Sequence, residues 1–197
     1  MTAQRELPRL LKLYKETIGP AAMEKFSLRN VHQLPRVVKI VLNSGVGRFL
    51  ENQKLKPEVR DAVADTLSVI TGQRSVMIKA RKSVSNFKVR AGAPSAFMVT
   101  LRGDRMWHFL DRLINLAIPR IRDFRGLKDT AFDPAGNYSM GLVEQAVWPE
   151  INMAKVNFTH GMNINIVFEN SNREMSKFLL AELGMPFVRP EQEVGMR

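Results

Sequence analysis

Apolar and polar residues alternate along three stretches of the chain, and a period of two predicts strands with one buried face. The apolar members are Val38, Ile40 and Leu42, then Phe97, Val99 and Leu101, and then Met162, Ile164, Ile166 and Phe168. The residues between them are Lys39, Val41 and Asn43, then Met98, Thr100 and Arg102, and then Asn163, Asn165 and Val167. Each stretch is therefore expected to present its apolar residues to a core and its polar residues to the opposite side.

Apolar residues at helical spacing predict an amphipathic helix over residues 7–18. Gly19-Pro20 is expected to break it, and a short second helix is predicted from 21 to 26. Two further helices are predicted, one from Pro57 to Gly72 and one capped by Asp104 and ending near Pro119.

Near the C-terminus, Ser171 with Glu174 forms a capping box that predicts a helix ending at Gly184. Residues 122–150 are expected to be irregular, with one short strand. One-sided strands separated by helices predict an α+β fold, a largely antiparallel sheet with helices on one face and the other face open. A single domain is expected over residues 1–188, followed by a tail at 189–197.

With 197 residues, 45% of them hydrophobic, the chain can bury a sizeable core. It has no cysteine, which excludes disulfides, thiolate metal sites and a cysteine nucleophile. The first residues resemble neither a secretory signal nor an organelle transit peptide, and no apolar run is long enough for a bilayer. A cytoplasmic protein is expected.

The charge is unevenly placed. The net charge is +11, yet residues 129–197 hold five basic and nine acidic residues, while residues 1–128 hold 25 basic and 10 acidic residues. A concentrated excess of +15 implies a polyanionic partner, either nucleic acid or an acidic membrane surface. The membrane alternative requires a basic amphipathic helix, whereas the densest charge lies in a segment bracketed by glycines.

That segment lies within residues 74–102, which contain seven basic residues and no acidic one. The cations are Arg74, Lys79, Arg81, Lys82, Lys88, Arg90 and Arg102. Gly72 and Gly92 bracket a long loop or extended arm, expected to be loosest over 80–86, with a base fixed by Met77, Val84, Phe87 and Val89. Phosphates would relieve the mutual repulsion, and Ser83 adds a neutral donor. The alternative is a basic loop that is merely solvated.

The polar side of the predicted sheet forms a second candidate surface, with Lys39, Asn43, Thr100, Arg102, Asn163 and Asn165. It lacks aromatic residues, so base stacking is not expected to be its main mode of contact. An ordinary polar sheet face remains the alternative. A third basic stretch, 119–128, is either a phosphate-binding turn or a place where Arg120 and Arg122 pair with nearby carboxylates.

Enzymatic signals are weak. Gly45-Val46-Gly47 follows a strand, but a dinucleotide fingerprint would need a third glycine where Leu50 stands. The histidines, His32, His108 and His160, are far apart and lack zinc spacing. No cofactor, metal or catalytic residue is expected, although an RNA-modifying or RNA-cleaving enzyme remains the competing class, since catalytic groups are recognised by geometry.

Several ordered blocks resemble the bacterial large-subunit ribosomal protein five family over roughly residues 8–188. They are Pro35-Arg36-Val37, Leu42-Asn43, Gly45-Val46-Gly47, Thr71-Gly72-Gln73, Lys79-Ala80-Arg81-Lys82-Ser83-Val84, Thr100-Leu101-Arg102-Gly103, Pro119–Leu127, Gly136–Gly141 and Pro149-Glu150-Ile151. The resemblance weakens over 152–163 and after Phe187.

The resemblance implies a structural constituent of the large ribosomal subunit, not an enzyme. The open sheet face of the protein would bind 5S rRNA in the central protuberance, beside large-subunit rRNA. The basic loop 72–92 would reach the elbow of the P-site tRNA. The protein would also contact neighbouring ribosomal proteins, including one of the small-subunit head. The rRNA-binding candidates are Arg36, Lys39, Asn43, Thr100, Arg102, Asn163 and Asn165, of which the last two rest on alternation alone. The tRNA-binding candidates are Arg74, Lys79, Arg81, Lys82, Ser83, Lys88 and Arg90.

Overall fold

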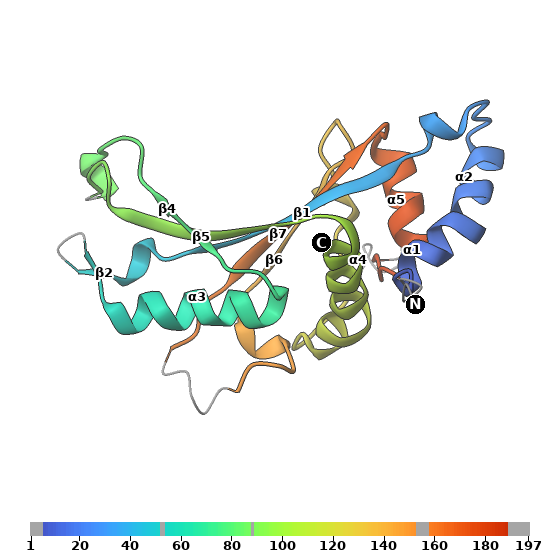
Figure 1. The fold of residues 1–197 in the computed structure, drawn as a ribbon. Coiled ribbons are helices and arrows are strands. Elements are labelled where there is room, and N and C mark those ends of the chain that lie inside the picture. Colours follow the sequence, from blue (N-terminus) through green and yellow to red (C-terminus); the bar gives the residue numbers. More distant parts are fainter. Residues whose placement is uncertain (1–5, 52–53, 88, 153–157, 189–197) are drawn as a thin grey trace, which may run out of the picture. The chain divides into compact units, whose positions relative to one another are not determined.

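A computed structural model describes residues 6–51, 54–87, 89–152 and 158–188 of the chain. Its main element is a mostly antiparallel sheet of five strands in the order β4-β5-β1-β7-β6 (Figure 1). The strands are β1 Arg36–Gly45, β4 Val76–Lys79, β5 Pro94–Leu101, β6 Tyr138–Leu142 and β7 Met162–Glu169. A small antiparallel pair is formed by β2 Leu50–Glu51 and β3 Lys54–Leu55. Together with the helices, these strands confirm the predicted α+β class.

The helices are α1 Arg9–Leu13, α2 Gly19–Lys25, α3 Pro57–Thr71, α4 Gly103–Arg112 and α5 Arg173–Glu182. Residues 122–150 are mostly irregular, as predicted, and contain strand β6 and two short 3-10 turns, Asp129–Ala131 and Gln145–Val147. The predicted tail at 189–197 lies outside the described residues.

The predicted alternation of buried and accessible residues is confirmed in β1, β5 and β7, with one exception. In β1 the alternation begins only at Ile40, so Val38 is half-buried while its neighbour Val37 is buried. The buried members include Ile40 and Leu42, then Phe97, Val99 and Leu101, and then Ile164 and Ile166. Alternation therefore assigns the two sides of each strand correctly wherever a strand is regular.

The chain forms two compact units, one of residues 1–40, 102–140 and 165–197 and the other of residues 41–101 and 141–164. We call them the terminal unit and the hairpin unit, respectively. Strands β1 and β7 each contribute residues to both units. The single domain expected over residues 1–188 stays a prediction.

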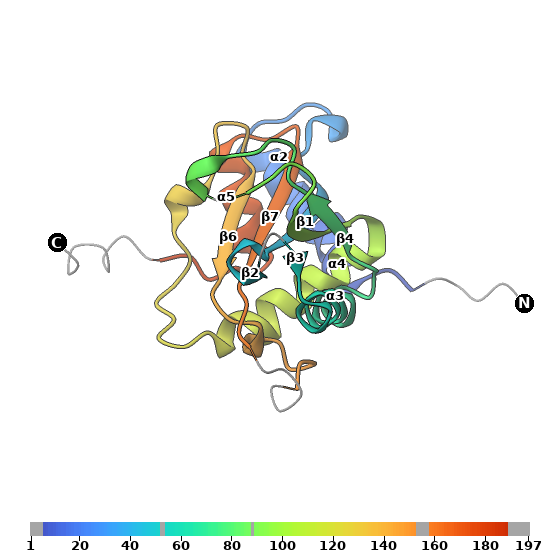
Figure 2. The same ribbon diagram turned by 90° about the vertical axis from the view of Figure 1, so that its left-hand side faces the viewer.

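In the hairpin unit, α3 lies along one side of β4 and β5 and is seen end-on in Figure 2. Pro57 stands in its first turn, where the missing N–H costs no hydrogen bond. Its buried stripe includes Val63, Leu67 and Ile70. Gly72 ends the helix in the left-handed conformation, with φ 65°, which glycine adopts without strain.

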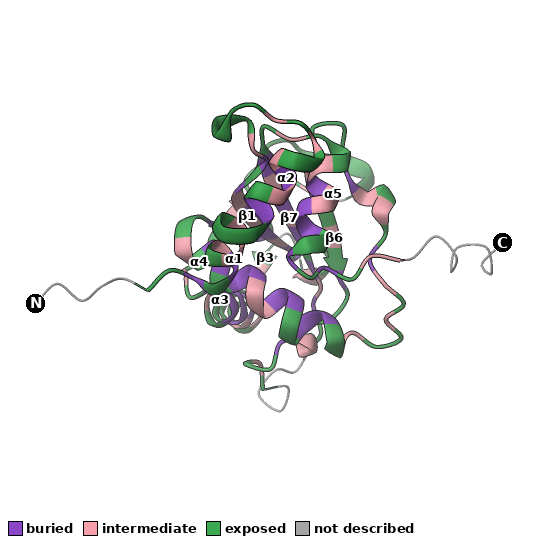
Figure 3. Ribbon diagram, turned by 90° about the vertical axis from the view of Figure 1, so that its right-hand side faces the viewer, coloured by how far each residue is buried: buried purple, intermediate pink, exposed green. Residues whose placement is uncertain are grey.

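In the terminal unit, α1 packs on α4 and α2 on α5, and Figure 3 shows buried and exposed residues alternating along these helices. Gly19-Pro20 does not break the helix as predicted. A π-helical turn, Tyr14–Ile18, joins α1 to α2, and Gly19 keeps a right-handed helical conformation. Pro20 directly follows this π-helical turn, in which the Gly19 N–H donates to Tyr14 O, so the helix accommodates proline where its hydrogen-bond pattern is already irregular.

Two predicted helix caps are wrong by one or two residues. Helix α4 begins at Gly103, so Asp104 lies in its first turn and Arg102 occupies the capping position. At α5 the cap is Asn172, whose side chain accepts a hydrogen bond of 2.9 Å from the Met175 N–H. Asparagine caps helices as well as serine does, so the local pattern could not discriminate between Ser171 and its neighbour.

Candidate nucleic-acid interface

The segment predicted as a long loop or extended arm is largely a β-hairpin. Strand β4 pairs antiparallel with β5, with Val76 opposite Met98 and Ile78 opposite Ala96. The register shifts between Ile78 and Lys79, which marks a bulge where the hairpin leaves the regular sheet. The prediction of a long loop is therefore wrong for residues 76–79, because β5 supplies partners for the backbone groups of this short apolar stretch.

The tip of the hairpin, residues 80–93, is closed by its own hydrogen bonds. The Ala80 N–H donates to Ala93 O and the Gly92 N–H donates to Ala80 O, each at 2.8 Å. Val84 and Val89 exchange two backbone hydrogen bonds of 2.9 and 3.2 Å. Looseness of residues 80–86 in the free protein stays a prediction, although two of its amides, at Ala80 and Val84, have acceptors.

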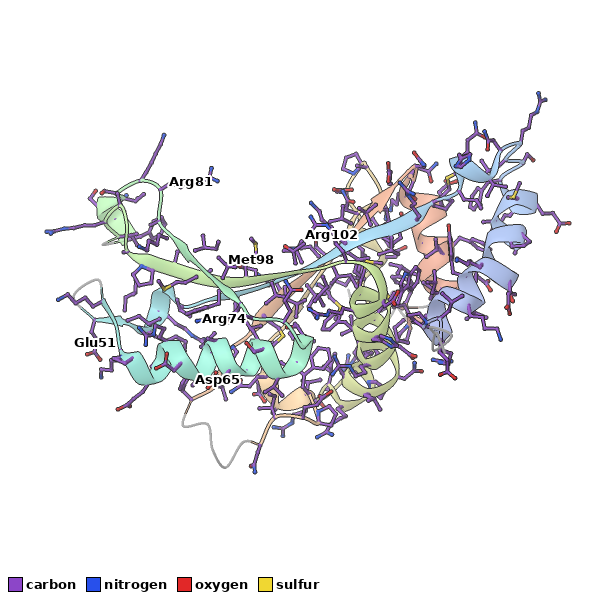
Figure 4. The ribbon with its side chains drawn as sticks, viewed as in Figure 1. Glu51, Asp65, Arg74, Arg81, Met98 and Arg102 are labelled. Atoms are coloured by element: carbon purple, nitrogen blue, oxygen red, sulfur yellow. The ribbon has the colours of Figure 1, made fainter. Side chains whose placement is uncertain are left out.

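Four exposed cations lie on this tip or directly before it: Lys79, Arg81, Lys82 and Arg90. We call them the tip cations, and Arg81 extends away from the hairpin in Figure 4. No ion pair joins any of them to another described residue. Lys88 lies outside the described residues. The tip therefore presents concentrated positive charge without a local counter-charge.

Arg74 and Ser83 differ from the tip cations. Arg74 precedes β4 and lines a depression beside α3 with Asp61 and Asp65 (Figure 4), so it is not part of the tip. Ser83 is exposed, but its hydroxyl accepts a hydrogen bond of 2.9 Å from the Ala91 N–H. It therefore supports the turn and still has its own O–H to donate.

Two side chains predicted to fix the base of the arm face solvent instead. Phe87 is 79% exposed and Val84 is 42% exposed. Met77 is also largely accessible, and only Val89 is half-buried. The prediction is wrong because the hairpin is held by backbone pairing with β5, which leaves these apolar side chains without a core to join.

Three of the predicted rRNA-binding residues lie on neighbouring strands of the hairpin unit: Asn43 in β1, Thr100 in β5 and Asn163 in β7. Met98 points to the side of β5 opposite α3 (Figure 4), and Thr100, two residues further on, shares that side. A methyl group at Gly141 of β6 would lie 3.4 Å from Asn163 Oδ1, which places Asn163 against the neighbouring strand.

The side chains of these three residues are accessible to different degrees. Asn163 is exposed, and Asn43 and Thr100 are half-buried. None of the three makes a side-chain hydrogen bond with another described residue. Their amide and hydroxyl groups are consequently free to serve a ligand.

The remaining rRNA-binding candidates belong to the terminal unit. Arg36 donates two hydrogen bonds, of 2.9 and 2.6 Å, to Glu169 Oε2, so its charge is already paired. Lys39 and Asn165 are half-buried, and Arg102 is exposed at the start of α4. Both side chains of this ion pair are solvent-exposed, so the pair contributes little and does not prevent Arg36 from meeting a phosphate.

The basic turn at 119–128 retains both of its interpretations. Arg122 approaches Asp123 at 3.9 Å, but both side chains are at least 90% exposed. Such a pair contributes little, so it does not prevent either group from meeting a phosphate. Arg120 is exposed and has no ion pair with a described residue.

A buried polar cluster in the hairpin unit was missed from the sequence. His160 is fully buried, and its Nδ1 lies 3.0 Å from Ser44 Oγ. Ser44 Oγ also lies 2.9 Å from Gly161 O, and a hydroxyl that donates to this carbonyl accepts from the Nδ1–H tautomer of His160. Gln145 Oε1 accepts from the His160 N–H, and its Nε2 donates to Phe158 O, each at 2.8 Å.

This cluster, which we call the His160 latch, joins Gln145 to residues 158–161 and fastens these to the end of β1 beside Asn43. Arg48 adds a hydrogen bond of 2.7 Å to Thr159 O. Burial lowers the pKa of His160, and the nearby positive charge of Arg48 lowers it further. A lone histidine in the sequence carries no sign of such a cluster, because its partners are 15 and 116 positions away.

The other histidines, His32 and His108, are exposed. Among the described residues no group of histidine, aspartate and glutamate side chains is placed to hold a metal ion. Within the same residues, no helix is both long and apolar enough to cross a membrane.

Comparison with known proteins gives two family matches and many relatives. Residues 30–90 match the sequence model of "Ribosomal protein L5", and residues 94–187 match the model of the C-terminus of the same ribosomal protein family. The large ribosomal subunit protein uL5 of Microcystis aeruginosa is 48% identical over 179 residues, covering 91% of this chain and 98% of that protein. That of Chloroflexus aurantiacus is 49% identical, covering 91% and 97%. The uL5c protein of Stigeoclonium helveticum shows the same identity and coverage.

Proposed function

We propose, from the premise that this chain belongs to the ribosomal protein L5 family, that it binds 5S rRNA through one sheet face and P-site tRNA through its basic hairpin. Membership makes it a structural protein of the large ribosomal subunit that associates with rRNA, and not an enzyme. In this proposal the sheet face binds 5S rRNA in the central protuberance, and the basic hairpin binds the elbow of the P-site tRNA.

The observation that carries the rRNA surface is a set of polar side chains on three adjacent strands that have no side-chain hydrogen bond with another described residue. Asn43, Thr100 and Asn163 offer amide and hydroxyl groups, and no carboxylate stands at the corresponding positions. Amide N–H and hydroxyl groups suit phosphate and 2′-hydroxyl oxygens, which dominate recognition of folded RNA by shape. Lys39, Arg102 and Asn165 of the terminal unit are proposed as separate rRNA contacts of that unit.

The tRNA surface is supported by the tip cations. These four exposed positive charges have no carboxylate partner among the described residues, so they repel one another in the free protein, and phosphates remove that repulsion. The hairpin presents them around a turn that is closed by backbone hydrogen bonds at Ala80 and between Val84 and Val89. A contact with a small-subunit head protein is supported only by the family resemblance.

Two triple variants separate the two surfaces. Asn43→Ala, Thr100→Val and Asn163→Ala together should weaken 5S rRNA binding at least tenfold, since each lost hydrogen bond to RNA contributes about 0.5–1.5 kcal/mol. Lys79→Ala, Arg81→Ala and Lys82→Ala together should weaken tRNA binding and leave 5S rRNA binding within about threefold of the wild type.

The matched control removes three exposed lysines elsewhere: Lys12→Ala, Lys15→Ala and Lys54→Ala. Binding is measured by fluorescence anisotropy with labelled 5S rRNA and tRNA transcripts at fixed salt, and circular dichroism checks the fold of each variant. The assignment of surfaces is reversed if the tip variant loses 5S rRNA and the sheet variant keeps it. The assignment is wrong altogether if the lysine control loses as much affinity for each RNA as the two triple variants do.

A further inference from the structure

We infer that Phe87, at the tip of the β4–β5 hairpin, stacks on an unstacked nucleobase of the RNA that the hairpin binds. The inference rests on the proposed RNA role of the hairpin and adds a contact of a different kind. The tip cations recognise phosphate charge, whereas Phe87 would recognise the flat face of a base.

The exposure of Phe87 is exceptional within this molecule. It is 79% exposed, and every other aromatic side chain among the described residues is buried or half-buried. The core would gain from burying a phenyl ring, yet the fold holds this one outward. The adjacent Val84 is 42% exposed, so the tip carries a small apolar surface amid its cations.

The backbone holds the ring in place without help from a core. Phe87 ends a 3-10 turn, Ser85–Phe87, that lies between the two residues of the Val84–Val89 bridge. Hydrogen bonds of 2.9 and 3.2 Å close that bridge on either side of the turn. A ring on a closed turn loses less conformational freedom on binding than one on a flexible chain.

The charge around the ring indicates what covers it. Arg81, Lys82 and Arg90 are exposed on the same tip, and residues 74–102 contain no acidic residue. A protein partner that buried Phe87 in an apolar pocket would also have to neutralise these cations. RNA does both at once, because its phosphates meet the cations and its bases offer stacking faces.

The sheet surface offers no group on which a base could stack. Asn43, Thr100 and Asn163 offer hydrogen bonds but no aromatic ring. Among the described surfaces, the hairpin tip therefore combines charge with an exposed ring. The ligand class is an unpaired or terminal base at a bend or loop of folded RNA, with little preference among the four bases, because every base has a stacking face.

Three substitutions at one position test the inference with the full-length chain and a tRNA transcript as the probe. Phe87→Ala should weaken binding about 5- to 150-fold, the equivalent of one stacked base. Phe87→Trp should retain wild-type affinity, and Phe87→Leu, which keeps the apolar volume and loses the ring, should resemble Phe87→Ala. Val143→Ala, at a residue that is 84% exposed in the same unit, is the matched control and should change nothing.

The salt dependence gives an independent readout. Phe87→Ala removes no charge, so the slope of log affinity against log salt should equal that of the wild type, while substitution of the tip cations should flatten it. Thermal unfolding should be unchanged in every Phe87 variant, because the ring packs on no core.

The outcomes distinguish this inference from the proposed function. If substitution of the tip cations weakens tRNA binding and Phe87→Ala binds tRNA like the wild type, stacking is refuted and the proposed tRNA role of the hairpin stands. Equal affinity of Phe87→Leu and the wild type would also refute stacking, and would indicate a general apolar contact such as a protein partner makes. If neither the cations nor Phe87 affect tRNA binding, both the proposed tRNA role and this inference are wrong.

Discussion

Replacing Gln145 by Met tests whether the His160 latch holds the hairpin unit together. The side chain is fully buried and makes two hydrogen bonds of 2.8 Å, from the His160 N–H and to Phe158 O. Methionine has a similar length but offers neither the acceptor nor the donors. The substitution therefore leaves a buried N–H and a carbonyl without partners.

The His160 N–H is buried, and leaving it unsatisfied costs about 1–3 kcal/mol in free energy of unfolding, whereas the Phe158 carbonyl is only part-buried and can accept from water. Domains of this size lose roughly 2–4 °C in Tm per kcal/mol, which gives a fall of roughly 2–12 °C. Because typical domains have only about 5–15 kcal/mol of stability, such a loss is readily measured by urea unfolding.

Tryptophan fluorescence reports the transition, since Trp148 is buried in the hairpin unit and Trp107 lies in the terminal unit. Trp107→Phe serves as the background, so that Trp148 reports alone. The control is Gln73→Met, which removes one hydrogen bond of 3.3 Å from a half-buried side chain. If Gln145→Met costs no more than Gln73→Met, the latch contributes no special stability and the reasoning fails.

Three further outcomes are expected. Burial lowers the pKa of His160 in the folded protein. The contribution of the neutral imidazole to stability is therefore fully present above the unfolded-state pKa of about 6.5 and is lost as pH falls through the folded-state pKa, by up to about 1.4 kcal/mol per pH unit. Urea unfolding at pH 7.5 and 5.5 should show this pH dependence, and His160→Gln should reduce it. Gly136→Ala should lower Tm, because Gly136 has φ +80° and a Cβ would lie 2.8 Å from Asn172 O, whereas Gly45→Ala, where nothing lies within 4 Å of a Cβ, should be nearly neutral by calorimetry. Substituting three tip cations should make the slope of log tRNA affinity against log salt less negative by about 2–3, and an unchanged slope would show that the tip contacts no phosphate.

Local patterns in the sequence determined strands β1, β5 and β7, the buried side of each, and the limits of helix α3. Alternation at Ile40, Leu42, Val99 and Ile164 follows from the pleat of a strand, in which every second side chain faces the core. Pro57 and Gly72 mark the limits of α3 because their backbone preferences are properties of single residues. The net charge and the family resemblance also follow from the amino-acid sequence alone.

Pairings across long stretches of chain were decided by the tertiary structure alone. Glu169 neutralises Arg36 from 133 positions away, which no charge count over neighbouring residues could show. Edge strand β4 forms only because β5 is beside it, and that pairing turned an expected loop into a hairpin with Phe87 facing outward. The His160 latch is of the same kind, since burial and hydrogen-bond partners depend on which segments meet in space, and a single residue's neighbours in sequence do not fix them.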